Sequence, residues 1–323
     1  MIVRWGLDSL REVMTELGVS RPLLVTMDFF KDAMPGIERR FTGALPHADV
    51  AGVEGTIAAS GDADVLVAYG GGSSIDTAKA ASVQTGLPII SIPTTYAGAE
   101  WTPFFGNRDA RTGKKSAGTG AKVMGIVYEP TLMLSLPPFD TCGTAMNALT
   151  HAAEALYTRG HTAESDVEAL EGARLVTRWL PVVMAEPKNV EARRGLLEGA
   201  MHSGSALRVG MGLAHAIAQI LGGKYDLPHG ALNAVALPHS LRFNQPYAAD
   251  AIRRLGEAMG TDDPAGKSAE LGALGCPMRF RDYKIPEGDL PDVAAQIAER
   301  PANKTNPKPA TAGEVLEVLR AAW

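Results

Sequence analysis

The sequence predicts a protein of two parts, an α/β half followed by an all-helical half. Three observations support this. The chain has 323 residues, more than one ordinary hydrophobic core needs. Before Pro137, short apolar runs alternate with amphipathic stretches, and after it the pattern becomes long and helical. Strand runs followed by helix runs are typical of two segregated domains. We therefore expect an α/β domain at residues 1–136 and an all-helical domain at residues 137–323.

Three short apolar runs in the first half have the character of buried strands. They are residues 23–26 (LLVT), 64–69 (DVLVAY) and 88–93 (PIISIP). Residues 74–85, between the second and third runs, carry apolar and small side chains at helical spacing. Unbroken apolar strands separated by helices predict a parallel sheet that is covered on both faces.

The second half shows helical periodicity and no convincing strand. We expect helices at residues 145–157, 163–180, 191–209 and 212–222. A Pro-rich turn then leads into a last helix at residues 314–323.

Composition and charge exclude several classes of protein. The net charge is −5 and no basic block occurs, which argues against a nucleic-acid partner. Neither a signal peptide nor an apolar stretch long enough to cross a membrane is evident, so no membrane partner is expected. The two cysteines, Cys142 and Cys276, fit no disulfide or metal framework. We therefore expect a cytoplasmic protein.

A glycine run follows the second predicted strand and opens a helix. Gly70, Gly71 and Gly72 would let a pyrophosphate approach the backbone, and the helix N-terminus would offer free N–H groups. The run is neither GxGxxG nor a P-loop, and the alternative is a βα turn that binds nothing. Thr94 and Thr95 follow the third strand and could donate to a ribose or phosphate, or could form an ordinary turn.

Three of the seven histidines lie in two short segments of the helical half. His151 follows Asn147 by four residues, so both lie on one helix face. His215 and Gln219 form a second such pair, and His229 follows after a turn. A single buried histidine is usually a core residue, but three that can converge indicate one site, with or without a metal ion.

Four segments together resemble the iron-containing alcohol dehydrogenase superfamily. They are GGGSSIDTAKA (70–80), IPTTYAGAEWTPFFG (92–106), MNALTHAAEALY (146–157) and GLAHAIAQILGGKYDLPHG (212–230). TTYAGAE, the Asn before ALTHA and the closing NPKPATAGEVLEVLRAAW resemble its maleylacetate reductase branch. The resemblance implies a dehydroquinate synthase-like fold, with the site in the cleft between the domains. It also implies a homodimer, NADH or NADPH as cofactor, and a role in aromatic compound catabolism.

The resemblance also assigns roles to individual residues. The cofactor-binding residues it implies are Gly70, Gly71, Gly72, Ser73, Asp76, Thr94, Thr95 and Lys115. The catalytic residues it implies are His151, His215 and His229, and Tyr96 is a further catalytic candidate.

The metal site of the superfamily has an Asp and three His, and maleylacetate reductases are similar to this chain in lacking the Asp. The four positions here are Asn147, His151, His215 and His229. A neutral amide does not offset the charge of Fe²⁺ or Zn²⁺, so no catalytic metal is expected. If an ion were bound, these four residues would hold it, because three His and a water can still coordinate zinc.

Two positions depart from the family pattern. Gln219 stands where the family usually has a His near the nicotinamide, and because Gln exchanges no proton near neutral pH, His215 or Tyr96 must do so. Met27, followed by Asp28, occupies the position of an Asp that favours NAD, which leaves NAD or NADP open.

The predicted function is reduction of a small keto acid or aldehyde carbonyl by hydride from NADH or NADPH. For a dianionic substrate, the cations of one loop are candidates or else form a solvated basic loop: Arg108, Arg111, Lys114 and Lys115. One alternative is a metal-dependent alcohol dehydrogenase of the same superfamily. Another is a cofactor-binding protein with altered or lost redox activity. Metal-assisted lyase chemistry of the dehydroquinate synthase kind is a third.

Overall fold

The computed structural model describes residues 1–34, 36–113 and 115–323, with the backbone alone at Lys115. The chain folds as two compact units, Met1–Met133 and Leu134–Trp323. The first is an α/β unit built on a parallel sheet, and the second is helical, which confirms the predicted fold class. Short 3-10 helices lie in the connections: Leu7–Ser9, Asp28–Phe30, Pro46–Ala48, Ala99–Trp101, Pro130–Ser135, Leu207–Val209, Phe280–Tyr283 and Glu287–Asp289.

The main sheet of the first unit is parallel throughout. In the described part of the unit its six strands follow the order β1-β8-β5-β4-β2-β3. Their bounds are β1 (Ile2–Trp5), β2 (Pro22–Val25), β3 (Arg40–Phe41), β4 (Val65–Gly70), β5 (Ile89–Pro93) and β8 (Val123–Tyr128). The three strands predicted from apolar runs are β2, β4 and β5. Pattern reasoning missed β1 and β3, which are short and carry Arg4 and Arg40, and β8, which Gly125 interrupts.

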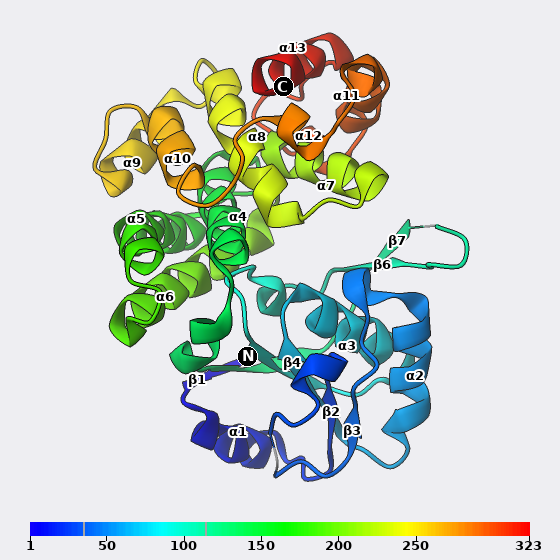
Figure 1. Ribbon diagram of the computed structural model, residues 1–323. Coiled ribbons are helices and arrows are strands. Elements are labelled where there is room, and N and C mark those ends of the chain that lie inside the picture. Colours follow the sequence, from blue (N-terminus) through cyan, green and yellow to red (C-terminus); the bar gives the residue numbers. More distant parts are fainter. Residues whose placement is uncertain (35, 114) are drawn as a thin grey trace. The chain divides into compact units, whose positions relative to one another are not determined.

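Helices cover both faces of this sheet, as Figure 1 shows. On one face Leu24 and Val67 pack with Leu10 and Val13 of α1 (Leu10–Leu17). The other face packs against α2 (Val50–Ser60) and α3 (Gly72–Thr85). Alternate strand residues point to opposite faces, so burial on both sides explains the unbroken apolar runs. A separate hairpin is formed by β6 (Phe105–Arg108) and β7 (Lys115–Gly118), where the sequence predicted only a loop.

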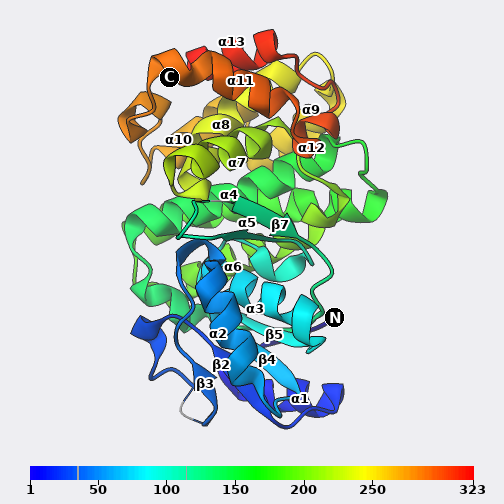
Figure 2. The ribbon, with the colours of Figure 1, turned by 90° about the vertical axis from the view of Figure 1, so that its right-hand side faces the viewer.

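The second unit is a packed set of helices. Their bounds are α4 (Pro138–Tyr157), α5 (Ala163–Ala185), α6 (Val190–Ala206), α7 (Leu213–Tyr225), α8 (His229–Asn244), α9 (Ala249–Met259), α10 (Pro264–Gly272), α11 (Leu290–Ala298), α12 (Pro301–Lys304) and α13 (Ala312–Ala322). The predicted helices correspond to α4, α5, α6, α7 and α13. Helices α7, α8, α11 and α13 pack side by side (Figure 2).

Helix α4 is the centre of this unit and positions much of the candidate site. From Thr141 to Tyr157 every residue except Thr144 is buried, as expected of a helix surrounded by others. It crosses the start of α8 closely. A Cβ at Gly230 would lie 2.4 Å from the carbonyl oxygen of Gly143, so only glycine fits there. The two glycines thereby let the start of α8, which carries His229, approach α4.

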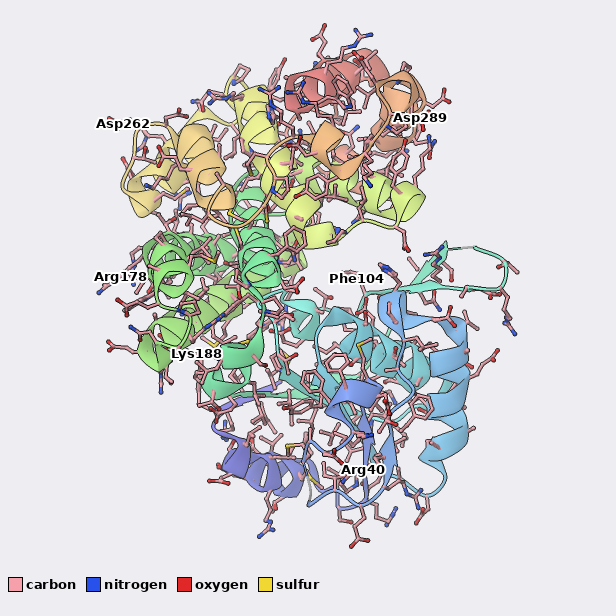
Figure 3. The ribbon with its side chains drawn as sticks, in the orientation of Figure 1. Arg40, Phe104, Arg178, Lys188, Asp262 and Asp289 are labelled. Atoms are coloured by element: carbon pink, nitrogen blue, oxygen red, sulfur yellow. The ribbon has the colours of Figure 1, made fainter. Side chains whose placement is uncertain are left out.

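Charged side chains lie on the outside of the unit, as Arg178, Lys188 and Asp262 do (Figure 3). Among the described residues, every helix is too short or too polar to span a lipid bilayer.

Candidate active site

The glycine run forms a close turn between β4 and α3. Gly70 has a φ of 141°, and a Cβ there would lie 2.5 Å from Oγ of Ser74. This position therefore requires glycine. At Gly72 the surroundings are open, because a Cβ would meet no atom within 4 Å. The backbone is partly exposed in front of α3, where a phosphate group could approach it.

Hydrogen-bond donors gather at the same turn. Helix α3 begins without a side-chain cap, so N–H groups of its first turn are available to an anion. Oγ of Ser74 is buried and has no hydrogen-bond partner within the described part of the chain. Oγ of Ser73 accepts a hydrogen bond from the backbone N–H of His47 at 3.1 Å. These features fit the pyrophosphate of a dinucleotide.

Thr94 and Thr95 lie beside the glycine turn. The N–H of Thr94 donates to the carbonyl of Gly70 at 3.1 Å. A Cβ at Gly71 would lie 3.0 Å from Cγ2 of Thr95. The carboxyl ends of β4 and β5 thus place both segments at one edge of the sheet. Tyr96, the next residue, is fully buried.

Asp76 joins α3 to the hairpin. Its carboxylate accepts from Nζ of Lys79 at 3.2 Å and from the N–H of Gly106 at 3.2 Å. Burial raises the pKa of Asp76, and the positive charge of Lys79 opposes that shift. Nζ of Lys79 also donates to the carbonyl of Phe104 at 2.8 Å. The structure therefore gives Asp76 partners that hold the hairpin against α3.

The basic loop is only partly described. Arg111 is exposed and pairs with Asp109, with 3.0 Å between Nε and Oδ1. Arg108 is half-buried in β6. Lys114 and the side chain of Lys115 lie outside the described residues, so their predicted roles stay predictions.

The second unit brings the three predicted histidines together. The ring of His215, on α7, stacks on that of His151, on α4, with centroids 4.7 Å apart. The ring of His229, at the start of α8, lies 5.6 Å from that of His215. His151 and His215 are buried, whereas His229 is accessible to solvent.

Glu154 determines how His215 is held. This buried side chain accepts from the N–H groups of Gly212 at 2.5 Å and Ala214 at 2.8 Å, at the start of α7. Its Oε2 also lies 2.6 Å from Nδ1 of His215. Because the carboxylate oxygens accept from backbone donors, we infer that Nδ1 of His215 carries a proton and donates as well. Nε2 is then the functional atom, and it is buried with no partner in the described residues.

The other two histidines have lowered pKa values. Burial lowers the pKa of His151 well below its usual range, with the neighbouring charge of His215 acting in the same direction. Burial and His215 also lower the pKa of His229, although its access to solvent weakens that effect. Both rings are expected to be neutral near pH 7.

Asn233, which sequence reasoning missed, connects Asn147 to His229. Its Nδ2 donates to Oδ1 of Asn147 at 2.6 Å and lies 3.1 Å from Nε2 of His229. Asn233 lies four residues after His229, so the sequence places both on one helix face. This spacing does not predict its partner on α4. Oδ1 of Asn147 and Nε2 of His229 therefore each already accept a hydrogen bond from Asn233. In the described residues, no group of three or more His, Cys, Asp or Glu side chains is arranged to hold an ion.

Gln219, one turn beyond His215 on α7, contacts an arginine that the sequence did not single out. Its Oε1 accepts from Nη2 of Arg300 at 2.8 Å and from Nε at 3.3 Å. Its Nε2 faces Sδ of Met211 at 3.6 Å.

Two family profiles match the chain, one in each half. The profile of the family described as "Iron-containing alcohol dehydrogenase" matches residues 3–125. That of the "Fe-containing alcohol dehydrogenase family, C-terminal" matches residues 141–323. The chain belongs to the iron-containing alcohol dehydrogenase family. It is accordingly an NAD(P)-dependent oxidoreductase.

Individual members place the chain near the maleylacetate reductases. A maleylacetate reductase of Pseudomonas knackmussii is 35% identical, over 99% of this chain and 95% of that protein. The crystal structure of maleylacetate reductase from Agrobacterium tumefaciens has a TM-score of 0.92 at 30% identity, covering 100% of this chain and 95% of that one. Sulfoacetaldehyde reductase from Bifidobacterium kashiwanohense, solved in complex with NAD+, has a TM-score of 0.90 at 25% identity and covers 100% of this chain and 96% of that one.

Proposed function

We propose that this family member reduces the carbonyl group of a small keto acid with NADH or NADPH and without a catalytic metal ion. Its similarity to maleylacetate reductases supports the substrate class. The observation that carries the proposal is the histidine cluster itself, three imidazoles beside the amide of Asn147. A neutral amide already bonded to Asn233 supplies no charge for a divalent cation.

The first unit would bind the dinucleotide. The open backbone at Gly72, the uncapped start of α3 and the buried hydroxyl of Ser74 suit a pyrophosphate. Thr94 and Thr95 would hold the ribose and the nicotinamide side, and Lys115 stays a predicted partner there. When bound, the nicotinamide supplies the hydride for carbonyl reduction.

The histidines would handle the oxygen of the substrate. Hydride addition turns the carbonyl into an alkoxide, which needs hydrogen-bond donors and then a proton. His215 is the best-placed proton donor, because Glu154 balances the positive charge of its imidazolium and leaves Nε2 available. His151, neutral by virtue of its lowered pKa, would orient the oxygen, and His229, whose Nε2 accepts from Asn233, would line the site beside it. Tyr96 is the alternative donor, and Gln219 cannot serve.

The test is oxidation of NADH and NADPH by chelator-treated protein, with maleylacetate and a panel of keto acids and aldehydes. We expect turnover with a keto acid at metal contents far below one ion per chain. Activity that disappears with chelator and returns with Fe²⁺ or Zn²⁺ would favour the metal-dependent dehydrogenase. Tight cofactor binding without any turnover would favour a protein that has lost redox activity.

A further inference from the structure

Arg300 is a half-buried cation with an unusual partner. It lies immediately before α12, and two of its N–H groups converge on one amide oxygen, Oε1 of Gln219. Within residues 1–34, 36–113 and 115–323, no carboxylate pairs with Arg300. A guanidinium is always charged, and partial burial without an anionic partner is unfavourable. Such a group is best explained by an anion that arrives from solution.

The backbone around Arg300 is held firmly. The Arg300 carbonyl accepts from the N–H of Asn303 at 3.0 Å, and the buried Asn303 amide donates to the carbonyls of Ala298 and Ala310, each at 2.9 Å. Thr305 donates to the carbonyl of Met211, just before α7, at 2.5 Å. The guanidinium is therefore presented from a fixed segment and orientated by Gln219.

The position of Gln219 relates Arg300 to the histidine cluster. Residues four apart on a helix lie on the same face, with Cβ atoms about 5–6 Å apart. His215 and Gln219 have this relation on α7. The guanidinium is therefore hydrogen-bonded to the side chain that lies one helical turn beyond the histidine that we assign to the carbonyl oxygen. This arrangement suits a molecule that carries a carboxylate near its carbonyl group.

We propose that Arg300 binds the carboxylate of the substrate and thereby sets a preference for keto acids over uncharged aldehydes. The inference rests on the proposed reductase function and assigns its anion specificity to the second unit. Gln219 acts as a positioning residue that aims the guanidinium. Two parallel N–H groups of an arginine match the two oxygens of a carboxylate, and Gln219 leaves Nη1 and the second N–H of Nη2 for that purpose.

The experiment compares wild type with Arg300→Gln and Arg300→Lys, using maleylacetate, an uncharged aldehyde and the non-reacting dicarboxylate succinate. The control is Arg320→Gln, which removes an exposed arginine from α13. We expect Arg300→Gln to raise the KM for maleylacetate about 10- to 100-fold, the range of a lost charge-assisted hydrogen-bond pair. Its kcat with the aldehyde should stay within about twofold of wild type, because an uncharged substrate makes no such pair. Arg300→Lys should recover part of the loss.

Succinate binding, measured by calorimetry, tests the carboxylate site at Arg300 separately from the proposed reductase function. If wild type reduces no keto acid, the proposed function fails, and weaker succinate binding by Arg300→Gln still supports the anion site. If wild type reduces maleylacetate but Arg300→Gln changes acids and aldehydes equally, Arg300 has no role in anion recognition. Equal succinate affinity in wild type and Arg300→Gln would overturn the inference whatever the kinetics.

Discussion

Replacing Glu154 by glutamine changes a carboxylate with two acceptor oxygens into an amide with one. In the native protein, one oxygen accepts from Ala214 and the other from Gly212 and from Nδ1 of His215. Whichever way the amide is turned, its NH₂ group faces at least one buried backbone N–H. His215 would also lose the charged partner that fixes its proton on Nδ1.

The size of the effect follows from these contacts. A buried donor left without an acceptor costs about 1–3 kcal/mol. Loss of the negative charge at the start of α7 adds about 0.5–1 kcal/mol. Relief from burying a carboxylate offsets part of this, so the free energy of unfolding of the second unit should fall by about 2–3 kcal/mol. General acid–base groups contribute about 100-fold or more to rate, so kcat with a keto acid should fall by at least that factor.

The assay is urea unfolding followed by two probes, together with steady-state kinetics of the fraction that is folded. The matched control is Glu168→Gln, since Oε2 of Glu168 also contacts a histidine, Nδ1 of His202 at 2.8 Å. That pair is partly exposed, at 39% and 27% for the two side chains, so its loss should cost less than about 1 kcal/mol and leave kcat unchanged. If Glu154→Gln matches this control in both stability and kcat, the reasoning about His215 is wrong.

Three further outcomes test the other parts of the site. Gly72→Ala should leave the unfolding midpoint near that of wild type, because its Cβ meets no atom within 4 Å, yet raise the Kd for NADH at least about tenfold by occupying the space in front of α3. Unchanged NADH binding, followed by fluorescence, would argue against a pyrophosphate there. Asn147→Asp restores an anionic ligand and should raise Zn²⁺ affinity at least about tenfold in calorimetry; no increase would mean that the missing carboxylate is not what disfavours the ion. His151 has a native pKa below its usual 6.5, so below that pH the unfolded chain takes up a proton that the folded chain does not, and stability is lost as pH falls. When the pH falls from 7 to 5, the free energy of unfolding of His151→Gln should therefore drop by up to about 2 kcal/mol less than that of wild type. Parallel curves of unfolding free energy against pH for the two proteins would contradict the lowered pKa.

Pattern reasoning succeeded where a local signal determines local structure. The apolar runs that became β2, β4 and β5 are buried on both faces, so their composition alone marks them. It failed where the signal depends on distant parts of the chain. The hairpin at β6 and β7 is held by Asp76 and Lys79 of α3. The local sequence of residues 105–118 does not predict these contacts.

Residue spacing along the chain predicts the glycine turn, its neighbour at Thr94 and Thr95, and the helix faces that carry His151 and His215. Parallel strands end at one edge, and helical residues four apart share a face, so spacing along the chain is enough for these features.

The partners of these residues depend on how helices distant in the chain pack against one another. Glu154 reaches His215 across 61 positions and Gln219 reaches Arg300 across 81. Periodicity fixes the face of a helix but not the helix that crosses it. Crossings depend on close packing, such as the approach of α8 to α4 that Gly143 and Gly230 permit.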